Sequence, residues 1–434
     1  MGTGPRVLRP ERDQPYWDMV DLDSQLGPDH LARIVWAFVD GLALPELYEP
    51  IKARDAVAGR PTPDPKMYLA LWLYATVEGV GSARALARLC QHHAAYRWIC
   101  GGVPVNDHGL SDVRSFAGAV LDPLLTESVA VLMAEGLISL DEVAVDGTKL
   151  AANAAKSSLR EAAGIAHFEA AARARVERLK AEVEADPRAG GQRRRAAAAR
   201  AAAETASRAQ SARAKLAELQ AEKARRATTH KKQEAAKGAP KVSTTDPEAR
   251  LMKMPDGSFR LAYNVMVAAV PQQQVILAIE PTDRRNEAGL AQPMVEEVAR
   301  RYGARPRRLL VDTRLATAPE IVALAGHADG PTLVLSPPPA ERDDIKPASA
   351  SQRQRRRKAE PPALAAWRQR MASAAGKLVY ARRKLIEPVN GRLKNGNWRR
   401  FVLRGLAKAR SEALLHAIAH NICRGHALRL AQAA

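Results

Sequence analysis

The spacing of apolar residues changes near residue 137, and this change most limits what the chain can fold into. Over residues 16–135 apolar side chains recur every three or four positions, as in HLARIVWAFVDGLAL and MYLALWLYATVEG. That period is typical of amphipathic helices, so we expect a helical region before the change. Beyond it, five segments rich in Val, Ile and Leu predict strands: LISLDEVAVDG, SFRLAYNVMVAAV, QQVILAIEPT, RRLLVDT and PTLVLSP.

The order of the later segments predicts a mixed sheet. An amphipathic segment, NEAGLAQPMVEEVARRYG, separates the third predicted strand from the fourth, and TAPEIVALAGHA, with Pro319 near its start, separates the fourth from the fifth. Three consecutive strands favour a meander, and alternating helices and strands favour parallel additions to it. We therefore expect an α/β fold, with a mixed sheet and flanking helices behind an all-α N-terminal domain.

Two segments interrupt this pattern. Residues 157–240, between the first two predicted strands, are rich in Ala, Arg, Lys and Glu and hold few large apolar residues. They predict an exposed helical hairpin, broken near Asp186-Pro187, with a basic tail that acts as a linker. A second interruption, residues 337–376, carries the run RQRRRK and predicts a mobile basic loop before the next helix.

The charge of the chain favours a polyanionic partner. The formal net charge is +20 and the isoelectric point is near 10.2. Nucleic acid is the simplest such partner, because Lys and Arg neutralise its phosphates and release counterions. A general bias toward Arg and Ala is the alternative. Residues 65–79 and 82–90, joined at Gly79-Val80-Gly81, are a candidate helix-turn-helix, although any small helical bundle contains such pairs.

Cysteine usage and hydropathy indicate a cytoplasmic protein. The three cysteines form no C-x-x-C pair, which argues against a disulfide framework and against a zinc site built on Cys90, His92, His93 and Cys100. The N-terminus has no apolar segment of the kind that signal peptides contain. The longest apolar run, LALWLYATVEGVG, is too short to span a membrane.

Two carboxylates stand at the ends of predicted strands. Asp146 follows Val143-Ala144-Val145 and precedes Gly147, and Asp312 follows Leu309-Leu310-Val311. An Asp in either position can simply end a strand or cap a helix. For each residue taken alone, this structural role and a role as a metal ligand are equally favoured. Two carboxylates from neighbouring strands can instead share divalent cations, and Mg²⁺ prefers oxygen ligands.

A third acid lies in KLVYARRKLIEPVNGRLKNGNWRRF. Tyr380, Arg383, Glu387 and Lys394 stand at offsets 0, 3, 7 and 14. At about 100° per residue they fall within roughly 60° of arc, which places them on one helix face. Such a face suits a metal ligand flanked by phosphate-binding donors, or an ordinary salt-bridge stripe facing solvent. Pro388 is expected to kink the helix or to begin a new one.

The pattern Y-x2-R-x3-E-x6-K formed by these four residues resembles the signature around the catalytic glutamate in one large group of DDE-type insertion-sequence transposases. Other segments are similar to the same group in the same order: GRPTPDPKMYLALWLYATVEGVGSARALARLC and YRWICGGVPVNDHGLSDVRSF to its helical N-terminal domain, VAVDGTKLAANA and STTDPEARLM to the surroundings of its first aspartate, and RRFVLRGLAKARSEALLHAIAHNICR to its C-terminal helix.

The resemblance implies an RNase H-like catalytic core. Asp146, Asp312 and Glu387 would form the DDE triad and bind two Mg²⁺ ions, for which Mn²⁺ can substitute. The implied reaction is in-line attack on a phosphodiester, first by water and then by the freed 3′-OH of the element. The residues expected to contact DNA are Tyr380, Arg383, Lys394, Lys149, Arg399 and Arg404. For Lys149 an ordinary surface position is an equal alternative, and for Trp398 packing in the core is favoured over stacking on a base.

The resemblance also implies that different parts of the chain have different functions. Residues 1–135 would be a helical DNA-binding domain, residues 136–156 with 241–434 the catalytic domain, and residues 157–240 a basic helical insertion. The implied partners are double-stranded DNA, at the element ends and at the target, and a second copy of the chain, since two ends must be brought together. The implied location is the cytoplasm, in association with the nucleoid.

The chain departs from the pattern of the group at two places. The group usually has Gly-Tyr-Asn and then Gln in the second strand, where this chain has Ala262-Tyr263-Asn264 and then Met266. The second aspartate is usually followed by Ala-Gly-Tyr, whereas Asp312 is followed by Thr313-Arg314-Leu315. Two alternatives therefore stand beside an active transposase: an impaired or repurposed copy that binds DNA, and a metal-dependent nuclease on the same fold.

Overall fold

The computed structural model describes residues 21–49, 51, 62–116, 118–186, 191–229, 238–328, 330–338 and 360–434. A group of helices comes first: α1 Leu31–Asp40, α2 Pro65–Val77, α3 Ala83–His92, α4 Ala94–Cys100, α5 Asp107–Phe116 and α6 Gly118–Ala134. The helices predicted as a helix-turn-helix are α2 and α3, joined at Gly79, which has a φ of 73°. Because α2 is buried from Met67 to Thr76, α3 is the helix of this pair that presents a face to solvent.

A mixed sheet follows the helical region, as predicted. Its strands are β1 Glu142–Ala151, β4 Arg250–Lys253, β5 Phe259–Val270, β6 Val275–Thr282, β7 Arg308–Val311 and β8 Leu333–Leu335. The strands lie in the order β6-β5-β1-β7-β8, and β4 pairs with the first residues of β5. β1 is antiparallel to β5 and parallel to β7, and β7 is parallel to β8. A meander with parallel strands added to it is the sheet of an RNase H-like fold, so the predicted fold class is confirmed.

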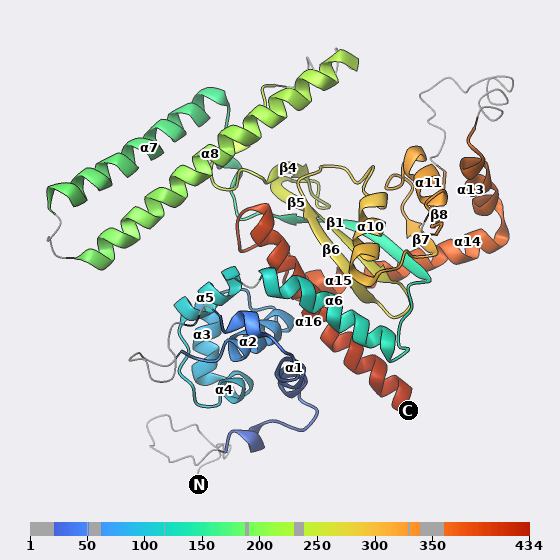
Figure 1. The fold of residues 1–434 in the computed structure, drawn as a ribbon, viewed down its shortest axis with the longest axis horizontal. Coiled ribbons are helices and arrows are strands. Elements are labelled where there is room, and N and C mark those ends of the chain that lie inside the picture. Colours follow the sequence, from blue (N-terminus) through green and yellow to red (C-terminus); the bar gives the residue numbers. More distant parts are fainter. Residues whose placement is uncertain are drawn as a thin grey trace, which may run out of the picture.

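Helices flank this sheet and tie it to the N-terminal region (Figure 1). They are α10 Ala291–Tyr302, α11 Ala318–Ala325, α13 Pro362–Ala372, α14 Ala374–Tyr380, α15 Glu387–Asn395 and α16 Leu406–Ala433. α16 packs against β6, α6 and α2. Its Asn421 amide exchanges two hydrogen bonds, each of 2.8 Å, with the backbone N–H and C=O of Ile276 on β6. This contact satisfies polar backbone groups at the edge of the sheet.

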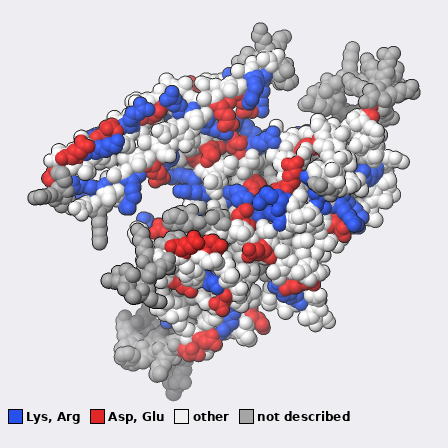
Figure 2. All heavy atoms as spheres, in the orientation of Figure 1, with Lys and Arg blue, Asp and Glu red and all other residues white. Residues whose placement is uncertain are grey.

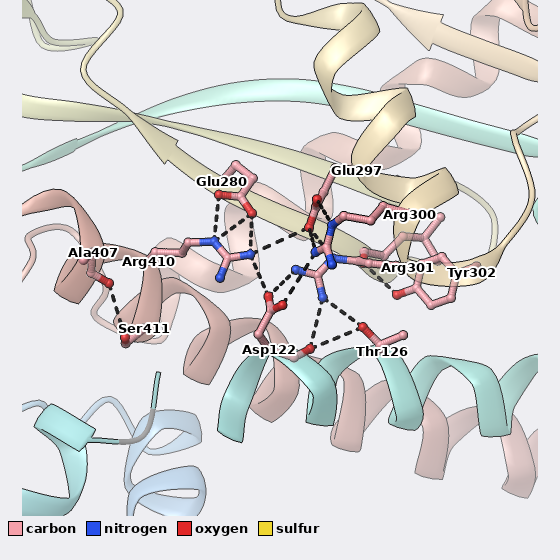
Figure 3. Close-up of polar contacts among 11 residues, drawn as sticks. Asp122, Thr126, Glu280, Glu297, Arg300, Arg301, Tyr302, Ala407, Arg410 and Ser411 are labelled. Carbon is pink, nitrogen blue, oxygen red and sulfur yellow. Dashed lines mark hydrogen bonds and ion pairs between the residues drawn. The ribbon is translucent and has the colours of Figure 1, made fainter. Parts of the chain in front are cut away.

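A partly buried ion network joins the same elements (Figure 3). Asp122 on α6 contacts Arg301 on α10 at 2.5 Å and Arg410 on α16 at 2.6 Å. Arg410 also pairs with Glu280 on β6, and the Arg301 side chain is fully inaccessible to solvent. Burial opposes ionisation of Asp122, but the two arginines outweigh it and lower the pKa of its carboxyl. The network therefore fixes α6 against the sheet.

The predicted helical hairpin is present between β1 and β4. It consists of α7 Ala162–Ala185 and α8 Gln192–Thr229, and its base is closed by β2 Leu159–Arg160 pairing with β3 Val242–Ser243. Figure 1 shows it projecting away from the sheet. Its core is a small cluster of its own around Leu216 and Leu219. Figure 2 shows basic side chains along both helices, with acidic ones between them.

Parts of two sequence predictions lie outside the described residues. The hairpin turn at 187–190, the linker at 230–237 and the basic run within 339–359 belong to them. The predicted loop over 337–376 was too long, because Pro362–Ala372 forms the helix α13. Pro362 stands at the helix start, where its missing N–H has no cost, and Trp367 and Met371 are buried.

Candidate active site

The two aspartates predicted at strand ends occupy matching places in the sheet. β1 and β7 run parallel, and Val145 pairs with Val311. Asp146 and Asp312 each follow that pair by one residue. Neighbouring strands lie about 4.8 Å apart, so the two acids stand next to each other where the parallel pairing ends. Burial is the main cause of the raised pKa of Asp146, and the charge of Asp312 contributes in the same direction.

Asp312 lies in a turn held by hydrogen bonds. Its Oδ1 accepts from the backbone N–H of Thr313 at 2.8 Å, and its carbonyl accepts from Leu315 N–H at 3.1 Å and from the Ser336 hydroxyl at 3.2 Å. Both Asp312 and Arg314 are exposed. Among the described residues, these two side chains form no ion pair with each other. The bulky turn therefore leaves the Asp312 carboxylate open to solvent.

The third acid comes from a helix that is less regular than predicted. The face over residues 380–394 is not continuous, because α14 ends at Tyr380 and residues 381–386 form a 3-10 helix. The new helix expected at Pro388 is confirmed, since α15 begins at Glu387. Pro388 has no N–H to donate to the preceding turn, so it lies in the first turn of a new helix. The break still delivers Glu387 and Arg383 to the sheet, since the 3-10 segment packs on β1 and β7.

Arg383 lies between two of the three acids. Its guanidinium is 3.6 Å from Asp146 Oδ1 and 3.8 Å from Glu387 Oε1. Burial opposes its charge, but Asp146 and then Tyr380 outweigh this and raise the pKa of Arg383. Burial also raises the pKa of Asp146, against the opposing effect of Arg383. Glu387 is 63% exposed and is free to change its contacts.

Asn390 is a site residue that the sequence reasoning missed. It is buried on α15, and its Nδ2 donates to Asp146 Oδ2 at 2.9 Å. Its Oδ1 has no hydrogen-bond partner. Buried amide oxygens rarely remain unpaired. An unpaired amide oxygen beside a carboxylate therefore points to a bound cation, which both oxygens would coordinate. The spacing of three residues from Glu387 was the available signal, because it places both on one side of a helix.

The predicted DNA-binding residues divide into three groups. Tyr380 is half-buried beside Arg383, and burial raises the pKa of its hydroxyl. Lys149 and Lys394 line one pocket next to Gly147, together with Lys253, whose carbonyl accepts from Lys149 Nζ at 3.2 Å. Burial lowers the pKa of Lys394, and the charge of Asp146 opposes this.

Arg399 and Arg404 form the third group and are not brought to the acids. Both are exposed near the end of β1, where Ala151 N–H donates to the Arg399 carbonyl and Arg404 Nε donates to the Asn153 carbonyl. Trp398 is buried, stacks on His416 at 4.2 Å and donates to Glu412. It is therefore a core residue, as favoured from the sequence, and does not offer a face to a base.

The donor set fits a hard divalent cation, although it is not assembled as a closed site. In the described part of the chain, no three His, Cys, Asp or Glu side chains converge tightly enough to enclose a metal ion. Asp146, Asp312 and Glu387 nevertheless supply only carboxylate oxygens, and Asn390 adds an unpaired amide oxygen. Mg²⁺ and Mn²⁺ prefer such oxygen ligands, whereas zinc sites are usually built from Cys and His side chains.

Two family models match the chain at its two ends. Residues 346–426 match the "Transposase DDE domain", and residues 20–115 match the "Transposase domain (DUF772)". The first match includes the whole Y-x2-R-x3-E-x6-K pattern and thus Glu387. Both matches support an insertion-sequence transposase of the DDE type. No curated protein and no solved structure matches it significantly.

The matched transposase models indicate a role in DNA transposition. Members of the DDE transposase family generally use divalent metal ions. The match to the DDE domain does not extend to Asp146 and Asp312, so their place in the site rests on the sheet geometry described above. Within the described residues, the transposase has no helix of the length and apolarity that a bilayer crossing requires.

Proposed function

We propose that this transposase binds the terminal inverted repeats of its insertion sequence, cuts the DNA there in a Mg²⁺-dependent reaction, and joins the cut ends to a target. One observation supports this most strongly. Asp146 and Asp312 follow the same pair of two parallel strands, and Arg383 connects Asp146 to Glu387 of the family signature. Three acids from distant parts of the chain thus lie around the point where the parallel pairing of β1 with β7 ends.

Asp146, Asp312 and Glu387 would hold the cations, and Asn390 keeps Asp146 oriented through its hydrogen bond. Two bound Mg²⁺ ions would supply charge stabilisation for in-line displacement at a phosphodiester and an activated oxygen nucleophile. Because Glu387 is exposed and 3.8 Å from Arg383, it completes the site by a change of its own side chain. Mn²⁺ serves as the alternative ion.

Basic side chains beside the acids would position the DNA. Lys149 and Lys394 share a pocket next to Gly147 and neutralise phosphates near the cut. Arg383, held by Tyr380, presents a planar guanidinium that binds phosphate in two places. Arg399 and Arg404, at the far end of β1, would contact the backbone further along the duplex.

The parts of the chain take separate tasks in this proposal. Residues 1–135 bind the repeat, residues 136–156 with 241–434 carry out the chemistry, and residues 157–240 form the basic insertion. The transposase acts as a homodimer on DNA, because both ends of an element must be joined together. Action on double-stranded DNA places it at the nucleoid in the cytoplasm.

The test is cleavage of a linear duplex that carries the repeats flanking the gene. We expect strand breaks at the repeat ends with Mg²⁺ and none with EDTA. Glu387→Ala serves as the inactive control and is expected to shift the same duplex in a gel as the wild type does. Wild-type binding without any Mg²⁺-dependent break would contradict the proposal.

Two features favour a second candidate, a transposase-derived protein that binds the same ends without cutting them. The acids are not enclosed around a common point, and Asp312 is followed by a turn that the family does not usually have. The same assay separates the candidates, since this one predicts repeat-specific binding and intact DNA. A nuclease on the same fold would give breaks but no joined product.

A further inference from the structure

Glu287 lies beside the proposed site and is not part of the DDE triad. It stands in the connection between β6 and α10, and its carbonyl accepts from Leu290 N–H at 3.1 Å. Gly289, with a φ of 78°, donates its N–H to the Leu315 carbonyl at 3.1 Å. Since Leu315 N–H in turn donates to the Asp312 carbonyl, the Glu287 connection is fixed to the turn that carries Asp312.

The Glu287 carboxylate occupies the space that a side chain at position 147 would fill. A Cβ atom on Gly147 would overlap its Oε1 atom. Gly147 directly follows Asp146, so the absence of a side chain there lets a second carboxylate approach the backbone next to the first. This close approach gives a physical reason for glycine after Asp146 that the strand itself does not supply.

The charges around Glu287 place it within the acid cluster. Burial raises the pKa of its carboxyl, the charge of Asp146 adds to this, and Asp312 contributes in the same direction. Lys149 acts in the opposite direction, and it lines the same pocket as Glu287 and Lys394. Glu287 therefore lies against the backbone next to Asp146 and lines the pocket in which DNA phosphates are proposed to lie.

Asn264 provides an independent sign of a ligand. It is fully buried on β5, directly opposite Lys149 in the ladder, and acts on the Glu287 carboxylate. Its amide donates a hydrogen bond that lowers the pKa of Glu287, whereas its amide oxygen has no hydrogen-bond partner. A buried amide oxygen without a partner is costly, and a cation bound beside Glu287 would remove that cost.

We propose that Glu287 is a fourth metal-binding acid of this transposase. Its carboxylate binds a divalent cation together with the carboxylate of Asp146. The inference rests on the proposed function, because the cation is the one that the triad holds. Glu287 contributes a carboxylate from an element different from those of the triad, and Gly147 is the position that admits it. The bound cation would then lie near the amide oxygen of Asn264, which otherwise has no partner.

Binding of Mn²⁺ alone to the full chain tests this without reference to DNA cleavage. The concentration of free Mn²⁺ is followed by electron paramagnetic resonance during a titration. We expect Asp146→Asn to abolish tight binding and Glu287→Gln to weaken it by about tenfold or more, since loss of supporting groups alone costs about 10- to 100-fold. The matched control, Glu296→Gln on the exposed face of α10, is expected to bind as the wild type does.

A second variant tests the role of position 147 with every acid retained. Gly147→Ala displaces the Glu287 carboxylate and is expected to weaken Mn²⁺ binding to a similar extent. The thermal midpoint of each variant is measured first, and unchanged midpoints assign the loss to the site. Wild-type affinity in both Glu287→Gln and Gly147→Ala, with binding lost in Asp146→Asn, overturns the inference and leaves the proposed function intact. A wild-type chain that binds no Mn²⁺ overturns both.

Discussion

At the scale of single residues, Asp146 is the point on which the site converges. It has Asp312 on the neighbouring strand, Arg383 at 3.6 Å and Asn390 at 2.9 Å, each from a different part of the chain. Burial raises the pKa of its carboxyl, so its charged form depends on these partners. Substitutions of these partners are therefore expected to affect the function of the Asp146 carboxylate more than the free energy of unfolding.

Asn390→Ala is the most direct change of this kind. It removes the hydrogen bond to Asp146 and leaves all the acids in place. We expect the cleavage rate under single-turnover conditions to fall by about 10- to 100-fold, as for other groups that orient a metal ligand, with DNA affinity unchanged. Asn395→Ala, on an exposed position of the same helix, is the control and is expected to cleave normally. Equal rates for both variants would show that Asn390 does not act on Asp146.

Some residues of the proposed site were open to prediction from the sequence and others were not. Asp146 and Asp312 were, because a strand and the residue that follows it are local features. Glu387 was, because it lies in a distinctive spacing. Glu287 and Asn264 were not, since their position depends on how β5 and the β6–α10 connection fold against β1, which no local pattern encodes.

At the scale of secondary-structure elements, the sheet and its main helices follow the sequence pattern closely, and the exceptions have local causes. The new helix expected at Pro388 is α15, but the 3-10 segment that precedes it was not predicted. The ion network around Asp122 was not predicted, because it joins α6, β6, α10 and α16 across long separations in sequence (Figure 3). Contacts of this kind decide how elements are held together.

Removal of one partner from the ion network is expected to destabilise the protein strongly. Asp122→Ala leaves the Arg301 side chain, which has no exposure to solvent, with one fewer carboxylate. Loss of a partner from a buried pair costs about 3–5 kcal/mol, and Glu297 at 2.7 Å from Arg301 offsets part of this. The free energy of unfolding from guanidinium titration should fall by about 3 kcal/mol. Asp141→Ala, at an exposed position, is the control, and an equal effect in both variants would contradict this account.

The contact between α16 and β6 gives a prediction about pH. His420 is buried, its Nε2 donates to the Gln274 carbonyl at 2.7 Å, and burial lowers the pKa of its imidazole to about 4. The unfolded chain therefore binds more protons between pH 6.5 and 4, and the stability that neutral His420 contributes is lost as the pH falls through this window. The loss can reach about 3 kcal/mol at pH 4.

His420→Gln keeps a donor for the Gln274 carbonyl and removes the titrating group. We expect the guanidinium midpoint of this variant, relative to wild type, to rise between pH 7 and pH 4. The same substitution at the exposed His92 is the control and should leave the pH dependence as in the wild type. A constant difference for His420→Gln across this range would show that the buried imidazole does not contribute.

At the scale of the whole molecule, a rigid core carries a separable basic arm. The main hydrophobic core runs from the N-terminal helices through the sheet to α16, whereas the hairpin has its own small cluster. α8 alone has ten Lys or Arg residues and three Glu residues. The pairing of β2 with β3 brings the two ends of the hairpin together at its base. The arm thus joins the rest of the chain at this base and through ion pairs such as Lys215 with Asp283 at 2.6 Å.

Replacement of residues 162–240 by a short Gly-Ser linker is expected to leave the core folded, with a similar thermal midpoint. DNA affinity should fall, and its dependence on salt should become shallower, because each lost phosphate contact removes about 0.9 from the slope of log K against log salt. Fluorescence anisotropy at several salt concentrations measures both quantities. Unchanged affinity and slope would show that the hairpin does not bind DNA.

The central claim is that acids from β1, from the end of β7 and from α15 act as one site in DNA strand transfer. The most direct test joins precut repeat ends to a target plasmid in the presence of Mg²⁺, with the wild type and with Asp146→Asn, Asp312→Asn and Glu387→Gln at equal DNA occupancy. We predict joined product with the wild type and a loss of about a thousandfold or more in each variant, because residues that act as a unit fail together. Joined product at the wild-type rate from any one of the three variants would contradict the claim.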